Sequence, residues 1–443
     1  MCDYLRRIGY EPSDLDKLNV VHITGTKGKG STSAFTERIL RAHLSGKIGL
    51  YTSPHLCAVR ERIRINGQPL EEDVFAKHFF EVWERLQGDQ KTLTPHTPVF
   101  PIYFRLLTLL AFHTFLSLGV TATVLEVGIG GTYDSTNIVP RPITTGISAL
   151  GLDHTAVLGN TIEEIARNKA GIYKRGVPAL SVKQDQGGEV LERYALEVGS
   201  RYEIVPMIPE TPLGLRGTHQ RINASLAVAL AKSFLAVQDS KRFREGDFDE
   251  ILPPSFVQPL RSTRWPGRCQ KVNQGKTTWL LDGAHTVESL RSCGEWAWDE
   301  GRPEILIFNC SGGRAGESLL VALLEAGARM AKKTVAEIGN SFDSVIFCTN
   351  VTYMDGHFKG DLTSNAIDPN DLSQLATQNA LRQAWLVLNP LFPADRVHAV
   401  PSIEHALEIV RGLGEKEVLV AGSLHLVGGV MEVAGLQDAL VMD

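Results

Sequence analysis

The chain has 443 residues, of which 43% are hydrophobic, enough for a folded core and for two or three domains of ordinary size. Its 45 Lys and Arg against 50 Asp and Glu give a net charge of −5 without a long basic block. Nucleic acid and anionic membrane surfaces are therefore not the expected partners. The six cysteines form no CxxC pair, which fits a reducing compartment and argues against zinc.

No secretory signal opens the chain, because residues 2–7 lack an apolar run, and the early acid Asp3 weakens a transit-peptide interpretation. The cytoplasm is the expected compartment, with a mitochondrial form left open. The most apolar long stretch, Phe104–Val120, contains Arg105 and His113. It therefore predicts a buried amphipathic helix and no membrane span.

Residues 20–40 predict a strand, a glycine-rich loop and a helix. Backbone N–H groups of such a loop turn toward an anion, and the following helix N-terminus adds positive potential. Lys29 can reach the outer phosphates of a nucleotide, and Ser31 can bind the Mg²⁺ that accompanies it. The usual phosphate loop places the hydroxyl residue directly after the lysine, whereas Gly30 intervenes here. A plain glycine-rich turn is the alternative. The expected ATP-binding residues of the loop are Gly25, Thr26, Lys27, Gly28, Lys29, Gly30 and Ser31.

Further strand-like runs at residues 48–52, 123–127, 144–149 and 179–182 alternate with helical segments. This alternation predicts a mostly parallel sheet covered by helices. Thr161 and Glu164 match a capping box, so a helix begins there and carries Lys169. Glu126 follows an apolar run at the carboxyl end of a strand, the edge where parallel sheets bind ligands, which favours a metal-binding role.

The composition changes around residues 247–266, where four prolines are expected to interrupt any regular element. We predict the domain boundary there, with a first domain of residues 1–262 and a second of residues 263–443. The second domain has its own strand series at residues 277–281, 305–308, 345–348, 397–400 and 418–420, which predicts a smaller α/β unit. Residues 353–371 are expected to form a long surface loop.

Nine further blocks occur in a fixed order: residues 51–56, 60–67, 126–131, 151–155, 169–172, 219–224, 265–268, 281–286 and 422–429. Through these blocks the chain resembles the folylpolyglutamate synthases of eukaryotes, members of the Mur ligase-like superfamily, nearly from end to end. The resemblance implies an α/β fold: an N-terminal P-loop ATPase domain with a mostly parallel sheet, followed by a smaller Rossmann-like α/β domain.

The resemblance also implies an ATP-dependent ligase that adds L-glutamate to the γ-carboxylate of a folate's glutamyl tail through an acyl phosphate, releasing ADP and phosphate. Folate, ATP and L-glutamate are the implied small-molecule partners of a monomeric enzyme. Two Mg²⁺ sites are implied, one served by Ser31 and one by Ser53, Glu126 and His154, and a monovalent cation is compatible with them. From the residues alone, His154 would be a hydrogen-bonding residue, because Mg²⁺ prefers oxygen.

Lys169 matches a family lysine understood to be carbamylated, which would convert it to an anion that meets Mg²⁺; an exposed helix lysine is the plainer alternative. By the same resemblance Asn223 contacts adenine, Arg268 phosphate and Asp282 ribose. His285 would orient the acyl phosphate or the incoming glutamate, with a hydrogen-bonded core histidine as the alternative. For Asn223 the alternative is a polar residue at a helix N-terminus.

Arg62 and Arg64 share one face of a strand-like segment, either as a solvated charge pair or as contacts to substrate carboxylates. Two other functions stay open. The chain could ligate another carboxylate, such as a specialised metabolite or dihydropteroate, since no short motif certifies folate. It could also be a catalytically impaired nucleotide-binding homologue, because the block at Arg314-Ala315-Gly316 lacks the acid and proline usual after this arginine.

Overall fold

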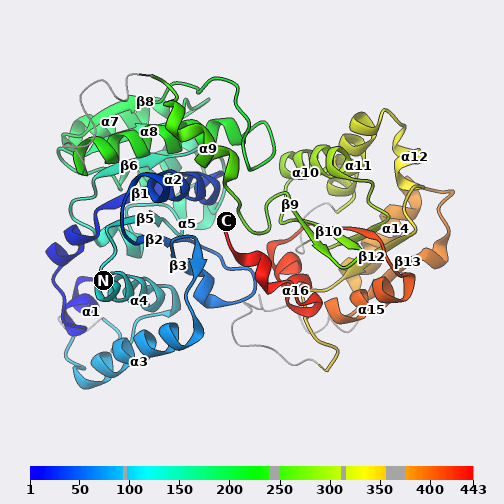
Figure 1. Ribbon diagram of the computed structural model, residues 1–443, viewed down its shortest axis with the longest axis horizontal. Helices are drawn as coiled ribbons and strands as arrows, with labels where there is room; N and C mark the ends of the chain where they lie inside the picture. The colour runs from blue at the N-terminus through cyan, green and yellow to red at the C-terminus, as the bar shows by residue number, and fades with distance from the viewer. Residues whose placement is uncertain (93–96, 239–249, 311–315, 356–374, 443) are drawn as a thin grey trace.

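The computed structural model describes residues 1–92, 97–238, 250–310, 316–355 and 375–442. These residues form two lobes, each built around one sheet, with the C-terminus lying between the lobes (Figure 1). Within the described ranges, the first sheet has eight strands in the order β4-β3-β2-β5-β1-β6-β7-β8. They are β1 (Val20–Thr24), β2 (Ile48–Tyr51), β3 (Ile63–Ile65), β4 (Gln68–Pro69), β5 (Ala122–Glu126), β6 (Thr144–Ile147), β7 (Pro178–Ser181) and β8 (Arg201–Ile204).

The second sheet has, among the same described residues, six strands in the order β13-β12-β11-β14-β10-β9. They are β9 (Gln270–Gln274), β10 (Thr277–Asp282), β11 (Ile305–Phe308), β12 (Ser344–Cys348), β13 (Val397–Val400) and β14 (Glu417–Ala421). Both sheets are mostly parallel. Antiparallel pairing is confined to β2 with β3, β3 with β4 and β9 with β10 in the described chain. The predicted α/β class with two mostly parallel sheets is confirmed.

Helices cover both faces of each sheet. Those of the first lobe are α1 (Cys2–Arg7), η1 (Pro12–Leu18), α2 (Lys29–His43), η2 (Val59–Arg62), α3 (Glu72–Gly88), α4 (Tyr103–Leu118), η3 (Ser135–Ile138), α5 (Thr155–Leu158), α6 (Ile162–Ala170), α7 (Gly188–Val198), α8 (Gln220–Gln238) and α9 (Pro254–Ser262). Those of the second lobe are α10 (Val287–Glu300), α11 (Gly316–Ala331), α12 (Val335–Gly339), α14 (Ala376–Leu388), η4 (Ala394–Arg396), α15 (Ile403–Leu413), α16 (Leu424–Ala434) and η5 (Gln437–Leu440). In the described ranges, no helix is apolar over a length sufficient to cross a bilayer.

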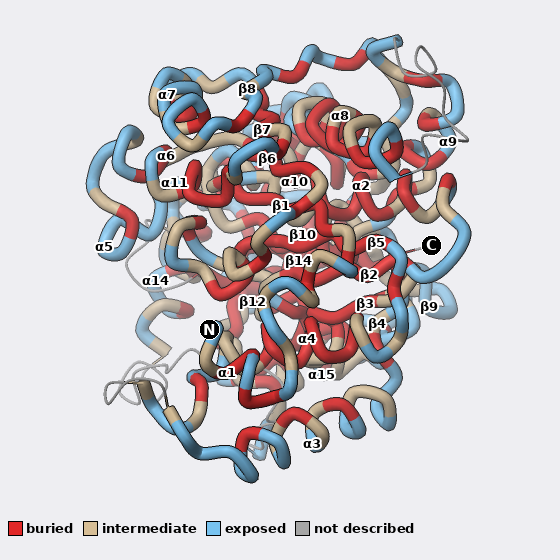
Figure 2. Tube along the Cα trace, turned by 90° about the vertical axis from the view of Figure 1, so that its left-hand side faces the viewer, coloured by how far each residue is buried: buried red, intermediate tan, exposed pale blue. Residues whose placement is uncertain are grey.

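The alternating side-chain directions of the strands place one core on each face of the first sheet. Val21 and Ile23 of β1 pack with buried residues of α2, α8 and α9, whereas Val20 packs with those of α4. The inner strands of both sheets are buried, whereas the edge strands β4, β8 and β9 and the outer faces of the covering helices are mostly exposed (Figure 2). The carboxyl ends of β1, β5 and β6 therefore meet at one edge of a rigid sheet.

The capping box at Thr161 and Glu164 and the buried helix near residues 104–120 are both confirmed, as α6 and α4. The expectation that prolines exclude regular structure near residues 253–266 is wrong, because α9 begins at Pro254 and contains Pro259. Proline suits the first helical turn, and the burial of Phe256 and Leu260 offsets the hydrogen bond that Pro259 cannot donate. Strand β9 was not predicted. The boundary at residues 262/263 stays a prediction, and most of the expected 353–371 loop lies outside the described residues.

The two lobes meet where α16 packs against the loop that follows β2. Gly428 of α16 lies so close to this loop that a Cβ would overlap the backbone of Leu56. Cys57 donates its Sγ–H to the Gly428 carbonyl at 3.2 Å. The absence of a side chain at residue 428 thus allows the contact between the lobes.

We predict that Gly428→Ala lowers the free energy of unfolding by about 1–3 kcal/mol, because overpacking against backbone exceeds the helix-propensity gain of alanine. Gly412→Ala in α15 is the matched control, since nothing lies within 4 Å of its added Cβ. That variant should gain up to about 1 kcal/mol. Urea denaturation of both variants measures the difference, and equal midpoints would contradict the steric argument.

Candidate active site

The loop between β1 and α2 has the backbone of a phosphate-binding turn. Gly25 and Gly28 have φ angles of 152° and 87°, a region that only glycine enters without strain. Gly28 is the N-cap of α2, so the first free N–H groups of a fifteen-residue helix point out of this turn. The N–H groups of Thr26 and Lys27 bond to Ala149 at 2.9 and 3.1 Å, which fixes the loop to the end of β6. The predicted strand, loop and helix are confirmed.

Two lysines converge on one carbonyl oxygen inside this loop. Lys29 donates to the Gly25 oxygen at 3.0 Å, and Lys169, which comes from α6, donates to the same oxygen at 2.8 Å. Lys169 is buried, so its interpretation as an exposed helix lysine is wrong. Burial and, second to it, the charge of Lys29 lower the pKa of Lys169 to about 7, against the opposing charges of Asp153 and Asp134. A substantial fraction of this amine is neutral at physiological pH.

Glu126 brings a buried carboxyl group to the same edge, at the end of β5. Burial raises the pKa of Glu126 to about 7, against the opposing charges of Lys29, Arg268 and Arg62. The Ser53 N–H also opposes the rise by donating to the carboxylate at 3.3 Å. A buried carboxyl of this kind favours a cation as its partner.

A pocket of about 100 Å³ joins these groups to the second lobe. Ser31, Ser53 and Glu126 line it from the first lobe. Trp265, Arg268 and Leu424 line it from the predicted second domain, residues 263–443. Three of the four predicted metal ligands therefore share one small cavity with the predicted phosphate-contacting arginine. A polar cavity that is built by both lobes suits a ligand whose ends differ in chemistry.

The N-terminus of α8 is connected to the loop by hydrogen bonds. Asn223 donates to Gln220 at 3.0 Å, and Gln220 donates to the Ser31 hydroxyl at 3.3 Å. The Asn223 amide also lies against Gly28, where a Cβ would overlap it. Asn223 is thus buried beside the loop, and its contact with adenine stays a prediction.

The second lobe presents Asp282 at the carboxyl end of β10 and His285 just after that strand. The Asp282 carboxylate accepts from the N–H groups of Cys269 and Ala284, each at 2.7 Å, which fixes its orientation. His285 contacts the Gly283 carbonyl through Nδ1 at 3.0 Å, so that nitrogen carries the proton. An ion pair of 3.3 Å between Lys27 and Glu288 links this region to the loop.

His154 does not line the pocket that contains the other three predicted metal ligands, and its role as a ligand stays a prediction. The His154 side chain is 51% exposed, and its Nε2 atom lies 3.9 Å from Asp153 Oδ2. Arg62 and Arg64 are both buried, so a solvated charge pair is wrong. Arg62 donates to His55 at 2.9 Å, and Arg64 lines the pocket. The altered block at Arg314-Ala315-Gly316 falls partly outside the described residues, at 311–315.

Glu61 and Trp265 were missed as site residues. Glu61 is buried and accepts from the N–H groups of Leu56, Cys57 and Ala58 at 3.1, 2.7 and 2.6 Å, so it shapes the loop that follows Ser53. A lone acid between Arg60 and Arg62 was the available signal. Trp265 closes over Gly30, with its Nε1 3.3 Å from where a Cβ would lie, and it also stacks under the Arg64 guanidinium at 5.6 Å.

No protein-family model matches the chain. It is, however, 43% identical to a folylpolyglutamate synthase of Candida albicans, in an alignment that covers 97% of this chain and 88% of that protein. It is 42% identical to the Neurospora crassa folylpolyglutamate synthase, with 99% and 85% covered.

Among solved structures, the chain resembles Mycobacterium tuberculosis folylpolyglutamate synthase complexed with ADP and AMPPCP, with a TM-score of 0.70, 24% identity, and 97% and 95% of the two chains covered. Escherichia coli FolC in complex with ADP gives a TM-score of 0.66 at 23% identity, with 98% and 94% covered. The phosphate loop, the buried acid beside it and the two mostly parallel sheets are typical of a nucleotide-binding α/β protein, and the similarity to folylpolyglutamate synthases identifies it as an ATP-dependent ligase. The chain belongs to the folylpolyglutamate synthase family.

The lowered pKa of Lys169 predicts a pH-dependent stability. Between pH 7 and 10.5 the unfolded chain holds a proton on this amine that the folded chain has released. Stability therefore rises with pH across that window, and below it the full cost of burying the protonated amine is present. We expect Lys169→Met to flatten this rise, so that the variant's stability relative to wild type is highest near pH 7. Urea midpoints measured across the window, with exposed Lys77→Met as control, test the slope; parallel profiles would contradict it.

Proposed function

We propose that the chain is an ATP-dependent ligase that adds L-glutamate to the γ-carboxylate of tetrahydrofolate and its polyglutamates, releasing ADP and phosphate. The observation that carries the proposal is the cavity in which Ser31, Ser53 and Glu126 of the nucleotide-binding lobe face Arg268 of the other. The 42–43% identity to folylpolyglutamate synthases over nearly the whole chain supports the substrate assignment.

The reaction requires an activated acid. A carboxylate does not accept an amine at neutral pH, so the γ-phosphoryl group of ATP is first transferred to a carboxylate oxygen, which gives an acyl phosphate and ADP. The amine of glutamate then attacks the carbonyl carbon, loses a proton and expels phosphate. Phosphoryl transfer depends mainly on positioning and on cancelling charge. The backbone N–H groups from Gly28 to Ser31, at the start of α2, would bind the phosphates, and the Lys29 amine would balance their charge.

Mg²⁺ fits the oxygen donors of this cavity. The buried Glu126 carboxyl, whose pKa is raised to about 7, would be stabilised as an anion by a divalent cation, and the Ser31 and Ser53 hydroxyls are further hard ligands. When bound with ATP, the ion would neutralise phosphate charge. His154 lies outside this cavity, so its part in a second Mg²⁺ site rests on the family resemblance alone.

A carbamate on Lys169 is a further part of the proposal. Carbamylation requires a neutral amine, and the pKa of about 7 that burial produces supplies one. The addition forms an N–C bond to CO₂ and releases one proton from the amine. The resulting anion would replace the repulsion between Lys169 and Lys29 by attraction, since the two amines share the Gly25 oxygen.

The second lobe, proposed as residues 263–443, would complete the site around the nucleotide. Arg268 already lines the cavity, whereas Asp282 ends β10 and His285 lies on the segment that follows it. We assign ribose to Asp282, adenine to Asn223 and orientation of the acyl phosphate or glutamate to His285. The monomeric state and the cytoplasmic location rest on the sequence alone.

The assay that tests this function supplies ATP, labelled glutamate and tetrahydrofolate to the purified chain. We expect equimolar ADP, phosphate and glutamate-extended folate. Lys29→Met should lower kcat by about 10²–10³-fold, because it removes a charge that stabilises the transferring phosphoryl group, whereas Lys77→Met on the exposed face of α3 should not. Release of AMP and pyrophosphate, or extension of a different acid only, would contradict the proposal.

The carbamate has its own test. Lys169→Ala should be inactive, and a short-chain carboxylic acid that occupies the vacated space should restore part of the activity, because it returns the missing anion. The same acid should not restore Lys29→Met. Wild-type turnover in Lys169→Ala, or equal rescue of both variants, would remove the carbamate from the mechanism.

A further inference from the structure

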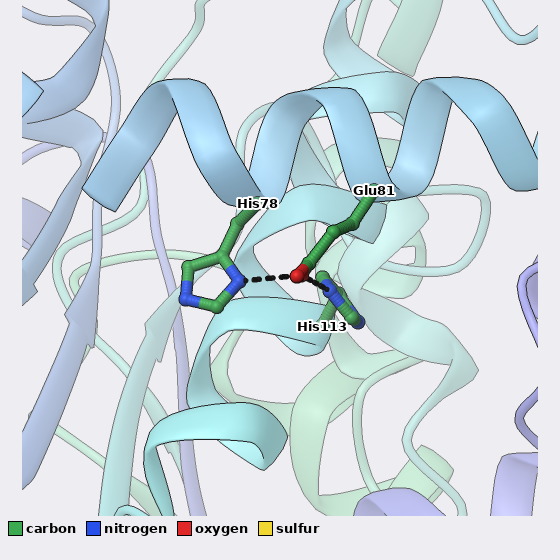
Figure 3. A group of neighbouring side chains, drawn as sticks. All are labelled: His78, Glu81 and His113. Atoms are coloured by element: carbon green, nitrogen blue, oxygen red, sulfur yellow. Dashed lines mark hydrogen bonds and ion pairs between the residues drawn. The ribbon is translucent and has the colours of Figure 1, made fainter. Parts of the chain in front are cut away.

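A group of metal-binding side chains lies away from the active site, between α3 and α4. His78 and Glu81 are one turn apart on α3, and His113 faces them from the middle of α4 (Figure 3). One nitrogen of each ring and one oxygen of the carboxylate lie within 4.8 Å of one another. Neither the nucleotide nor the acyl-transfer chemistry uses these residues.

The Glu81 carboxylate is the centre of the group. Its Oε2 atom accepts from His78 Nδ1 at 3.0 Å and from His113 Nε2 at 2.7 Å (Figure 3). The two rings cross nearly at right angles, with centroids 5.3 Å apart, so their nitrogens point at one spot. Both histidines are buried, whereas the Glu81 side chain is 35% exposed and gives the spot access to solvent.

The ligand types suit a divalent metal. Imidazole nitrogens and a carboxylate oxygen are donors that Zn²⁺ accepts, and here one atom of each side chain lies at the same spot.

A residue from the N-terminal segment orients one ring. Tyr10 Oη lies 2.8 Å from His113 Nδ1. When His113 Nε2 gives up its proton to become a ligand, the neutral ring carries its proton on Nδ1, and the Tyr10 oxygen can accept that hydrogen bond. Metal-bound histidines commonly have such an outer partner on the second nitrogen, where it fixes the tautomer.

We propose that His78, Glu81 and His113 form a three-ligand binding site for Zn²⁺. Two imidazoles and one carboxylate are a ligand set that zinc accepts, with the fourth tetrahedral position open on the exposed side of Glu81. Ligands about 2.0–2.2 Å from zinc lie roughly 3.3–3.5 Å apart. The carboxylate must therefore withdraw by about half an ångström, which its partial exposure permits.

Bound zinc would stabilise the packing of α3 against α4 in the first lobe. It would join α3 to α4, and through Tyr10 it would hold the N-terminal segment to both. Arg85, one turn further along α3, works against a cation here, because its charge also disfavours protonated His113. We therefore expect weaker binding than at a structural site with four protein ligands. The absence of a CxxC pair argued against a cysteine-bound zinc only. A set of histidine and carboxylate ligands on two separate helices leaves no such spacing in the sequence.

The test compares zinc binding by full-length wild type and two near-isosteric variants after treatment with a chelator. In His78→Asn the amide nitrogen takes the place of Nδ1, and in His113→Gln it takes the place of Nε2. Both variants keep the hydrogen bond to Glu81 but lose an imidazole ligand. Competition against a chromogenic zinc chelator should show one more equivalent bound by wild type, and an affinity loss above about 100-fold in each variant.

Three further readouts accompany the titration. Tyr10→Phe, which changes only the outer partner, should weaken binding by about 10–100-fold. Co²⁺ should give the visible bands of tetrahedral coordination in wild type but not in His78→Asn, and Zn²⁺ should raise the thermal midpoint of wild type only. His398→Asn on β13 is the control for loss of an unrelated histidine. Equal zinc stoichiometry and affinity in wild type and His78→Asn would overturn the proposal, as would no binding by wild type at micromolar zinc.

Discussion

The carbonyl oxygen of Gly25 accepts hydrogen bonds from two lysine amines, and the rest of the site is arranged around that contact. The left-handed backbone of the loop turns this carbonyl toward Lys29 and Lys169. Burial of the Lys169 amine and, second to it, the charge of half-buried Lys29 lower the pKa of Lys169, so this amine gives up its proton readily. The pKa of the buried Glu126 carboxyl is raised by burial, and the positive charge of Lys29 opposes that rise. Polar groups held in this way need little reorganisation when a highly charged nucleotide arrives.

The second constraint is the contact between the lobes. Glu61 binds three successive backbone N–H groups, and this fixes the loop whose Leu56 carbonyl meets Gly428 of α16. The same loop carries Ser53 into the cavity that Arg268 lines from the other side. The second lobe is thus held relative to Ser53 by a contact between backbone segments, at Leu56 and Gly428. Such a contact is stiffer than one between long side chains.

Much of this architecture can be read from the sequence, because strands buried on both faces are short apolar runs separated by glycine and proline. The strands of both sheets fall within a residue or two of expectation, apart from β9 and the short β4 and β8. Strand β9 lies at an exposed edge of its sheet and contains the polar residues Gln270, Lys271 and Asn273. Its sequence therefore lacks the run of apolar residues that predicts a buried strand. Helix α9 was not predicted, because its prolines have a low helix propensity. The helix forms because the burial of Phe256 outweighs that low propensity.

Part of the site could also be predicted from the sequence, and part could not. Chain order placed the loop and Glu126 at one sheet edge, since parallel strands all end on the same side, whereas the family resemblance brought Lys169 to the site. It could not show that His154 is exposed, that Arg64 is buried under Trp265, or that His78 and His113 meet, because each of these depends on how separate segments pack. Local patterns specify elements and motifs, and long-range packing decides which side chains become neighbours.

The last residues of the chain return to the first lobe. Arg64 donates to the Leu440 carbonyl at 2.6 Å and Arg41 to that of Met442 at 3.3 Å, and the C-terminus lies between the lobes (Figure 1). An affinity tag or fluorescent protein fused behind residue 443 would therefore press on the junction, whereas the N-terminus lies on the far side of the first lobe. Purification handles and spectroscopic labels for this enzyme belong at the N-terminal end.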